Sequence, residues 1–129
     1  MTDPAGIDIE AAGIAATIES LAAEEVDRLP FGVIRLDPAG VVTQYSRLER
    51  HLSGYRREAV GRDFFAEIAP CMDNAAFRGR IERARTAGRL DIVFDYVSDM
   101  PNGARDVELR VRVVSALDGG CWILMQRDA

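Results

Sequence analysis

The residue in this 129-residue chain whose side chain is best suited to covalent chemistry is Cys71, a cysteine that directly follows a proline. Pro70 fixes its own φ and disfavours helical geometry at Ala69, so a preceding helix must stop and the thiol is predicted to lie on a loop. Asp73 or Asn74 is expected to cap the next helix, whose dipole would then favour a thiolate or acylated sulfur at Cys71. On residue type alone, however, a free cysteine most often fills space in the core.

Three further side chains with hydrogen-bonding groups recur four residues apart: Tyr45, Glu49 and Ser53. If a helix begins near Tyr45, they share one stripe, beside a stripe of Leu48 and Leu52 that is expected to contact the core. A glutamate usually belongs to a solvated face, but a stripe of tyrosine, glutamate and serine without a lysine is less typical of one. If Glu49 is buried, it is expected to be protonated, because desolvation raises the pKa of a carboxyl.

Other catalytic and metal-binding arrangements find little support in the sequence. His51 is the only histidine, and it is expected on the surface because it lies about half a helical turn from Glu49. Neither a third catalytic member nor a Gly-rich oxyanion turn accompanies a pair of Cys71 and His51. One histidine and two distant cysteines, Cys71 and Cys121, lack metal-ligand spacing. We therefore expect no enzyme, no metal site and, in a reducing compartment, free thiols rather than a disulfide.

The composition is that of one ordinary globular domain, with 48% apolar and 29% charged residues. The net charge of -5, from 16 basic and 21 acidic residues, argues against nucleic acid or an anionic membrane as the partner. The sequence shows neither a secretory signal nor an apolar run of about 18 residues that could span a bilayer. A cytoplasmic location is therefore expected.

The spacing of apolar residues changes from helical to alternating along the chain. Ile14, Ile18, Val26 and Leu29 predict an amphipathic helical segment that ends at Pro30 and is only weakly stable by itself. An α+β fold is predicted, with a five-stranded antiparallel sheet, short helices on one face and residues 1–29 as an N-terminal cap on the other, ahead of a core of residues 30–129. The predicted strands are 33–36, 41–45, 90–97, 107–114 and 121–126, and the predicted helices after the cap are 46–54, 64–68 and 74–87.

Several segments resemble the photoactive yellow protein family, small blue-light receptors with a PAS fold. The string from Phe64 to Cys71, Phe-Phe-Ala-Glu-Ile-Ala-Pro-Cys, is the specific part, because PAS domains in general lack a cysteine there. The resemblance spans nearly the whole chain, and its other matching segments are Gly32 to Asp37, Gln44-Tyr45, Glu49, Gly61 to Asp63, Phe94 to Tyr96 and Cys121-Trp122.

The resemblance implies that p-coumaric acid is bound covalently, as a thioester of Cys71 whose carbonyl is held by the backbone N–H of that residue. It further implies a phenolate that accepts short hydrogen bonds from Tyr45 and a protonated Glu49, with Ser53 behind Tyr45. The remaining residues expected around the cofactor are Tyr55, Phe64, Ala69, Pro70, Tyr96 and Met100.

The same resemblance implies a light-driven trans–cis isomerisation, after which Glu49 passes its proton to the phenolate. A buried carboxylate costs several kcal/mol, a large share of the roughly 5–15 kcal/mol that stabilises a domain. We therefore expect the least stable element, from about Ile9 to Leu29, to detach as the signal.

Two departures from the family pattern are expected to alter the photocycle. Tyr55 follows Ser53-Gly54 where an arginine is common, which changes the charge near the phenolate. Met100 lies two residues before the usual methionine position, which holds Asn102, and Ser98 stands where an aromatic residue is common. A slower recovery and a shifted colour are expected.

Two other functions are compatible with the same residues. A PAS module without a chromophore would bind another small ligand or a partner through its sheet. A cysteine acyl-transfer enzyme would use Cys71 transiently and would need a base within hydrogen-bond reach of the sulfur. Since no kinase, DNA-binding or second domain is recognisable, a monomer or weak dimer is expected to signal to a separate protein that remains unknown.

Overall fold

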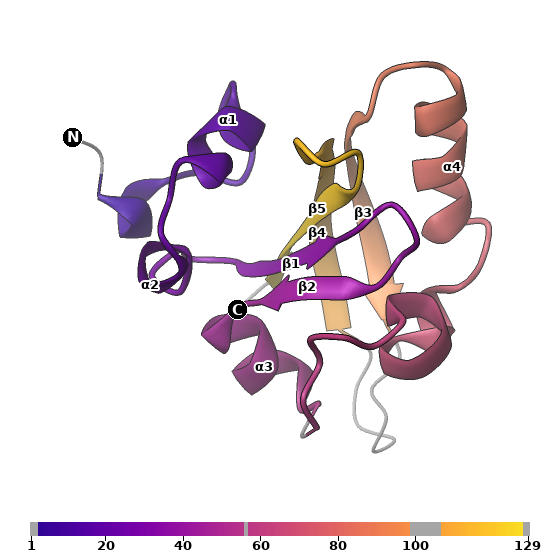
Figure 1. Ribbon diagram of the computed structural model, residues 1–129, viewed down its shortest axis with the longest axis horizontal. Helices are drawn as coiled ribbons and strands as arrows, with labels where there is room; N and C mark the ends of the chain where they lie inside the picture. The colour runs from indigo at the N-terminus through magenta and orange to yellow at the C-terminus, as the bar shows by residue number, and fades with distance from the viewer. Residues whose placement is uncertain (1–2, 56, 99–106, 128–129) are drawn as a thin grey trace.

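The computed structural model describes residues 3–55, 57–98 and 107–127 of the chain. Its centre is an antiparallel sheet with the strand order β2-β1-β5-β4-β3 (Figure 1). The strands are β1 (Gly32–Leu36), β2 (Val42–Tyr45), β3 (Asp91–Ser98), β4 (Val107–Ser115) and β5 (Cys121–Arg127). The predicted five-stranded antiparallel sheet is thus confirmed.

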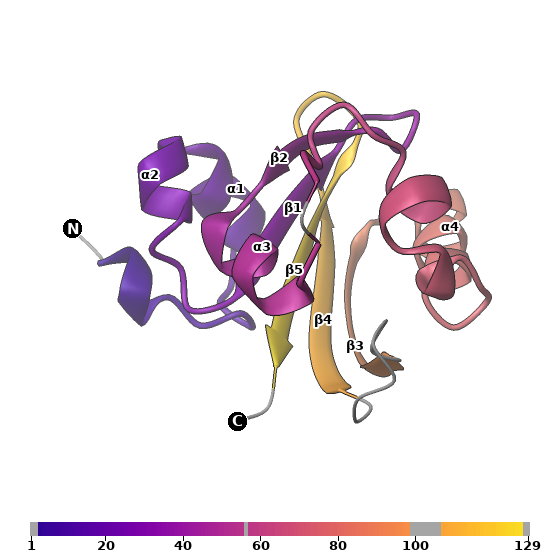
Figure 2. The same cartoon turned by 90° about the horizontal axis from the view of Figure 1, so that it is seen from below.

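Helical segments lie on both sides of the sheet (Figure 2). On one side are α3 (Arg47–Ser53), the π-helical turn η2 (Phe64–Ile68), the 3-10 turn η3 (Pro70–Met72) and α4 (Arg78–Thr86). The other side is covered by a segment that contains the 3-10 turn η1 (Pro4–Gly6), α1 (Ile14–Glu19) and α2 (Ala23–Val26). We call residues 3–29 the cap. No helix in the described part of the chain is long and apolar enough to cross a bilayer.

The two faces of the sheet bury two separate apolar clusters, because successive residues of a strand point to opposite sides. In β5, Ile123 and Met125 belong to the cluster beneath η2, η3 and α4. Trp122 and Leu124 belong to the cluster beneath the cap, where they pack with Ile18 and other apolar cap residues. The alternation along a single strand therefore separates the side of the sheet that carries η2, η3 and α4 from the cap side.

The cap differs from prediction in that its helical pattern over 14–29 forms two short helices. The hydroxyl of Ser20 donates to the carbonyl oxygen of Thr17 at 2.6 Å and ends α1. Ala22 is extended, and its N–H donates to the carboxylate of Glu25 at 2.9 Å, so a new helix begins there. Such local side-chain bonds compete with a continuous helix. The break lets both short helices turn apolar residues to the sheet.

A buried arginine ties the start of the cap to the sheet. Arg112 of β4 is 7% exposed. Its guanidinium donates to the carbonyl oxygens of Ile9 at 3.1 Å and Ala11 at 2.6 Å, and to the Asp91 carboxylate at 3.0 Å. These charge-assisted bonds satisfy a cation that would otherwise be costly to bury.

Two carboxylates fasten the helical part of the cap. One oxygen of Glu19 accepts hydrogen bonds from the indole N–H of Trp122 at 2.9 Å and from the backbone N–H of Leu117 at 2.8 Å. The carboxylate of Asp27, at the end of α2, accepts a hydrogen bond of 2.8 Å from the backbone N–H of Arg47, the first residue of α3. The cap is therefore bound both to β5 and to α3.

Replacing Ile18 with alanine is expected to loosen the cap before it loosens the sheet. The Ile18 side chain is 1% exposed, and removal of a buried isoleucine side chain destabilises a structure by about 2–5 kcal/mol. Short helices depend on such packing, so amide hydrogen exchange should accelerate over residues 9–29 while β4 stays protected. Leu117→Ala is the control, because that side chain is 85% exposed. An equal acceleration in β4 would show that the cap does not unfold separately.

Candidate functional site

A cavity of about 670 Å³ lies between α3, the η2–η3 segment and the strands β4 and β5. This volume is within the range of small-molecule sites. The predicted site residues that line it are Tyr45, Glu49, Ser53 and Tyr55 from the β2–α3 segment, and Phe64, Ala69, Pro70 and Cys71 from the η2–η3 segment. Tyr96 lies outside the lining, and Met100 and Asn102 fall outside the described residues.

The helix that carries Glu49 is fixed to β1 at its first turn. Ser46 caps α3, and its hydroxyl oxygen accepts the N–H groups of Glu49 at 3.2 Å and Val33 at 3.0 Å. The N–H of Ser46 donates in return to the carbonyl oxygen of Val33 at 2.9 Å. Gly54 ends the helix with φ 73°, a left-handed conformation that favours glycine. The helix predicted over 46–54 is confirmed.

The orientation of α3 buries its glutamate instead of its leucines. Glu49 is 1% exposed, whereas Leu52 is 37% exposed at the edge of the cavity. The expectation that Leu52 contacts the core is therefore wrong, because the anchor at Ser46 turns the neighbouring stripe inward. His51 lies on the surface, as predicted.

Glu49 forms a bidentate ion pair with Arg127, the last residue of β5. The two guanidinium nitrogens lie 2.9 and 3.0 Å from the two carboxylate oxygens. Burial raises the pKa of Glu49, and the arginine opposes part of that rise. The predicted upward direction of the Glu49 pKa shift is thus found. The pairing with Arg127 was not predicted, because the predicted strand ended at Gln126. The alternation of Ile123, Met125 and Arg127 could have placed it on the cavity side.

Tyr45 and Ser53 meet, although the predicted helical stripe is wrong for Tyr45, which ends β2 while Glu49 and Ser53 lie on α3. The phenol and hydroxyl oxygens are 2.9 Å apart, and the Ser53 oxygen also accepts the backbone N–H of Tyr55 at 3.2 Å. Burial, with a smaller contribution from the charge of Glu49, raises the pKa of Tyr45 to about 12. Tyr45 is therefore a neutral hydrogen-bond donor at physiological pH.

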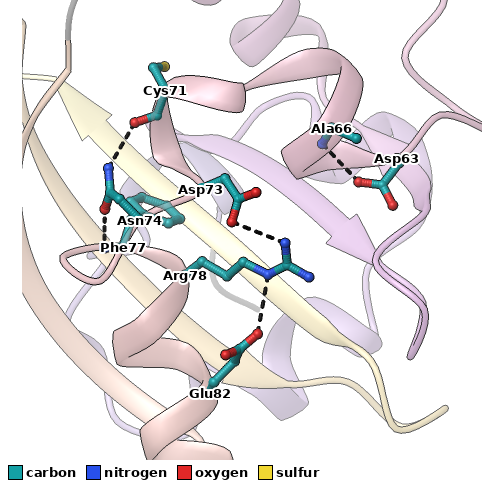
Figure 3. A network of polar contacts seen from close by, with 8 residues as sticks. All are labelled: Asp63, Ala66, Cys71, Asp73, Asn74, Phe77, Arg78 and Glu82. Atoms are coloured by element: carbon teal, nitrogen blue, oxygen red, sulfur yellow. Dashed lines mark hydrogen bonds and ion pairs between the residues drawn. The ribbon is translucent and has the colours of Figure 1, made fainter.

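Cys71 lies in the turn η3, with its thiol exposed and bordering the cavity. Its carbonyl oxygen accepts hydrogen bonds from the amide of Asn74 at 2.9 Å and the phenol of Tyr96 at 3.0 Å. The side-chain oxygen of Asn74 accepts the N–H of Phe77 at 3.0 Å (Figure 3). Tyr96 and Asn74 thus hold the backbone of the cysteine turn. The predicted loop placement of the thiol after Pro70 is confirmed.

The helix after Cys71 begins later than predicted, which overturns the expected effect of its dipole. α4 starts at Arg78 instead of residue 74, because Asn74 stabilises a turn that ends at Phe77. Asp73 pairs with Arg78 at 3.1 Å on the exposed surface, as Figure 3 shows. A helix dipole acts only within its first turn, so it does not reach Cys71.

The described residues offer no second catalytic arrangement around the thiol. None of them forms a hydrogen bond with the sulfur of Cys71, and Cys121 lies buried in β5 with its thiol free. Within these ranges, no group of three or more histidine, cysteine, aspartate or glutamate side chains could hold a metal ion. The lining of the cavity therefore brings one accessible thiol together with a buried phenol and a buried carboxyl.

Gly32 is a site residue that the sequence interpretation named only as the first residue of a segment resembling the family. A Cβ atom built on Gly32 would overlap with a carboxylate oxygen of Glu49. Glycine is therefore required there, because the carboxyl group packs directly against the backbone of β1.

Comparison with known proteins relates the chain to light receptors. Photoactive yellow protein of Rhodobacter capsulatus is 34% identical over 115 residues, which are 85% of this chain and 91% of that protein. The photoactive yellow protein domain of the sensor histidine kinase Ppr from Rhodospirillum centenum shares 38% identity and superposes with a TM-score of 0.78, covering 87% of this chain and 98% of that domain.

A more distant structure supports the fold alone. A PAS domain from Colwellia psychrerythraea has 13% identity and a TM-score of 0.64, over 82% of this chain and 92% of that one. No protein-family model matches the chain. The predicted PAS fold is confirmed.

Gly32→Ala is expected to push the Glu49 carboxyl away from β1 and weaken its pairing with Arg127. Overpacking of this kind costs about 1–3 kcal/mol, which urea denaturation can measure. Gly6→Ala is a matched control, since an added Cβ at Gly6 meets nothing within 4 Å. Equal stabilities of the two variants would contradict the packing of Glu49 against β1.

Proposed function

The chain belongs to the photoactive yellow protein family, and we propose that it is a blue-light photoreceptor that carries a p-coumaroyl group as a thioester of Cys71. One observation supports this above all: an accessible thiol borders the same cavity as a buried phenol and a buried carboxyl. A phenolic acyl group needs these groups, one for attachment and two for its phenol oxygen.

The residues of the cavity suit such a group in size and polarity. The cavity volume of about 670 Å³ is large enough for one phenolic acyl chain. Apolar side chains of Phe64, Ala69 and Met125 provide walls, and Tyr45 and Glu49 provide the polar end. When bound there, the group would absorb blue light and isomerise about its double bond.

Tyr45 and Glu49 are proposed to hold the phenolate oxygen in the dark. Tyr45 keeps its proton because its pKa is raised to about 12, and Ser53 fixes the position of its hydroxyl group. Burial favours the protonated form of Glu49, which can therefore also donate a hydrogen bond. After light absorption, Glu49 transfers this proton to the phenolate oxygen and becomes a carboxylate.

The cap is proposed to respond to the ionised glutamate. A charge created in the interior raises the free energy of the folded state by several kcal/mol, and α1 and α2 are too short to be stable alone. The Asp27–Arg47 hydrogen bond connects the cap to the helix that carries Glu49. We propose that residues 9–29 detach from the core of residues 30–129 and are read by a separate signalling protein.

Mixing the chromophore-free protein with an activated p-coumaroyl donor should give a stable mass adduct and a yellow colour. Cys71→Ser should abolish both, because the attacking sulfur is lost. Glu49→Gln should keep the adduct and shift the absorption maximum, since an amide replaces the carboxyl at the phenolate.

Cys121→Ser is the matched control for this reconstitution, because Cys121 is buried in β5 and does not line the cavity. Protein that stays colourless would favour a PAS module without a chromophore. An adduct that turns over would favour an acyl-transfer enzyme.

Illumination of the reconstituted protein should accelerate amide hydrogen exchange over residues 9–29 and leave β4 unchanged. The reason is the ionisation of Glu49, so Glu49→Gln should show little light-dependent exchange. Mass spectrometry of peptides after dark and light labelling measures both. Identical exchange of the cap in dark and light would refute cap release.

A further inference from the structure

Arg127 is a second charged group inside the proposed cofactor cavity. It lies at the end of β5, opposite Leu109 of β4, and its side chain points to the face that also bears Met125. The side chain is 17% exposed, and that of its partner Glu49 is 2% exposed. Among the described residues, this is the one ion pair that Glu49 forms.

Other ionisable groups line the cavity without pairing with Glu49. They come from β2, from the segment after α3, from η2 and from η3, and are Tyr45, Tyr55, Arg57, Glu67 and Cys71. On α3 itself, Arg50 and His51 are exposed and do not line the cavity. The charge state of Glu49 therefore depends mainly on burial and on Arg127.

The geometry of the pair favours the ionised form of Glu49. A guanidinium remains protonated at all physiological pH values, and its two parallel N–H donors match both oxygens of a carboxylate. A protonated glutamate would leave Arg127 without that match. Because Arg127 is at the end of its strand and partly exposed, it can turn to solvent more easily than Glu49 can.

We propose that Arg127 is a built-in counter-ion of Glu49, which pairs with the carboxylate in the chromophore-free chain and again whenever Glu49 has given up its proton. The second half of this inference rests on the proposed function. The arginine favours proton release and opposes the return of the proton from the phenol oxygen to Glu49. Arg127 then neutralises the charge of the carboxylate formed in light. This lowers the free-energy cost that would favour detachment of the cap, and it slows the recovery of the dark state.

The first half can be tested in the chromophore-free protein by a 13C NMR titration of glutamate side chains, with Glu49→Gln to assign the signal. Loss of an adjacent opposite charge shifts the ionisation of a carboxyl by about one to three pKa units. Arg127→Gln should therefore make Glu49 a roughly ten- to thousandfold weaker acid. Arg50→Gln, which removes an exposed arginine of α3, should leave Glu49 unchanged.

An unchanged titration of Glu49 in Arg127→Gln would overturn the proposal. If that variant does not fold, Arg127→Met decides, because methionine also removes the charge and its flexible, unbranched side chain can fill the same space. A weaker Glu49 acid in Arg127→Met supports the counter-ion role, and a titration equal to that of the wild type contradicts it.

The second half can be tested after reconstitution, by following the recovery of colour after a light flash. Arg127→Gln should recover faster than the wild type and Arg50→Gln, because the uncompensated carboxylate takes its proton back more readily. Equal recovery rates would overturn the role of Arg127 in light. If the wild type forms no adduct, the proposed function fails, whereas the titration still decides whether Arg127 is the counter-ion.

Discussion

The burial of one carboxyl group against the backbone of β1 is the constraint on which the site depends. Gly32 leaves the space for Glu49, and Ser46 fixes the turn of α3 that presents it. Arg127 provides the opposite charge from the last position of β5. Without these three contributions the interior would exclude the carboxyl, since a buried charge is tolerated only when it is paired and hydrogen-bonded. The polar end of the cavity thus depends on contacts that compensate an otherwise unfavourable group.

Much of the fold could be predicted because local patterns and global structure agree. The alternation of apolar and polar residues in β4 identifies a strand. The helix α3 is identified by a serine at its start and a glycine at its end. The four-residue spacing of Glu49 and Ser53 places both on one stripe of α3, whereas Tyr45, predicted on the same stripe, ends β2 instead. The association of this stripe with Cys71, however, came from the resemblance to a family and not from spacing, because no local pattern links residues so far apart.

The features that escaped prediction depend on tertiary contacts. Whether Glu49 or Leu52 faces inward is a matter of helix rotation, which the anchor at Ser46 determines. The start of α4 depends on Asn74, whose side chain binds the Cys71 turn and Phe77 together. The partner of Glu49 comes from the far end of the chain, and only the pairing of β1 with β5 brings it near. These features cannot be predicted from hydrophobic periodicity, because periodicity does not show which other elements pack against a given face.

The hydrogen bond from Arg47 to Asp27 joins the cap to the helix that carries Glu49, so the proposed cap release would be thermodynamically linked to the ionisation of that residue. Coupling free energies are reciprocal: if one event changes the equilibrium of another, the second changes the first by the same factor. If the proposed cap release occurs, a protein that captured the N-terminal segment would therefore stabilise the ionised form of Glu49 by the same free energy by which ionisation promotes the capture. With the proposed chromophore bound, the equilibrium between its two protonation states would then report on docking of the receiver.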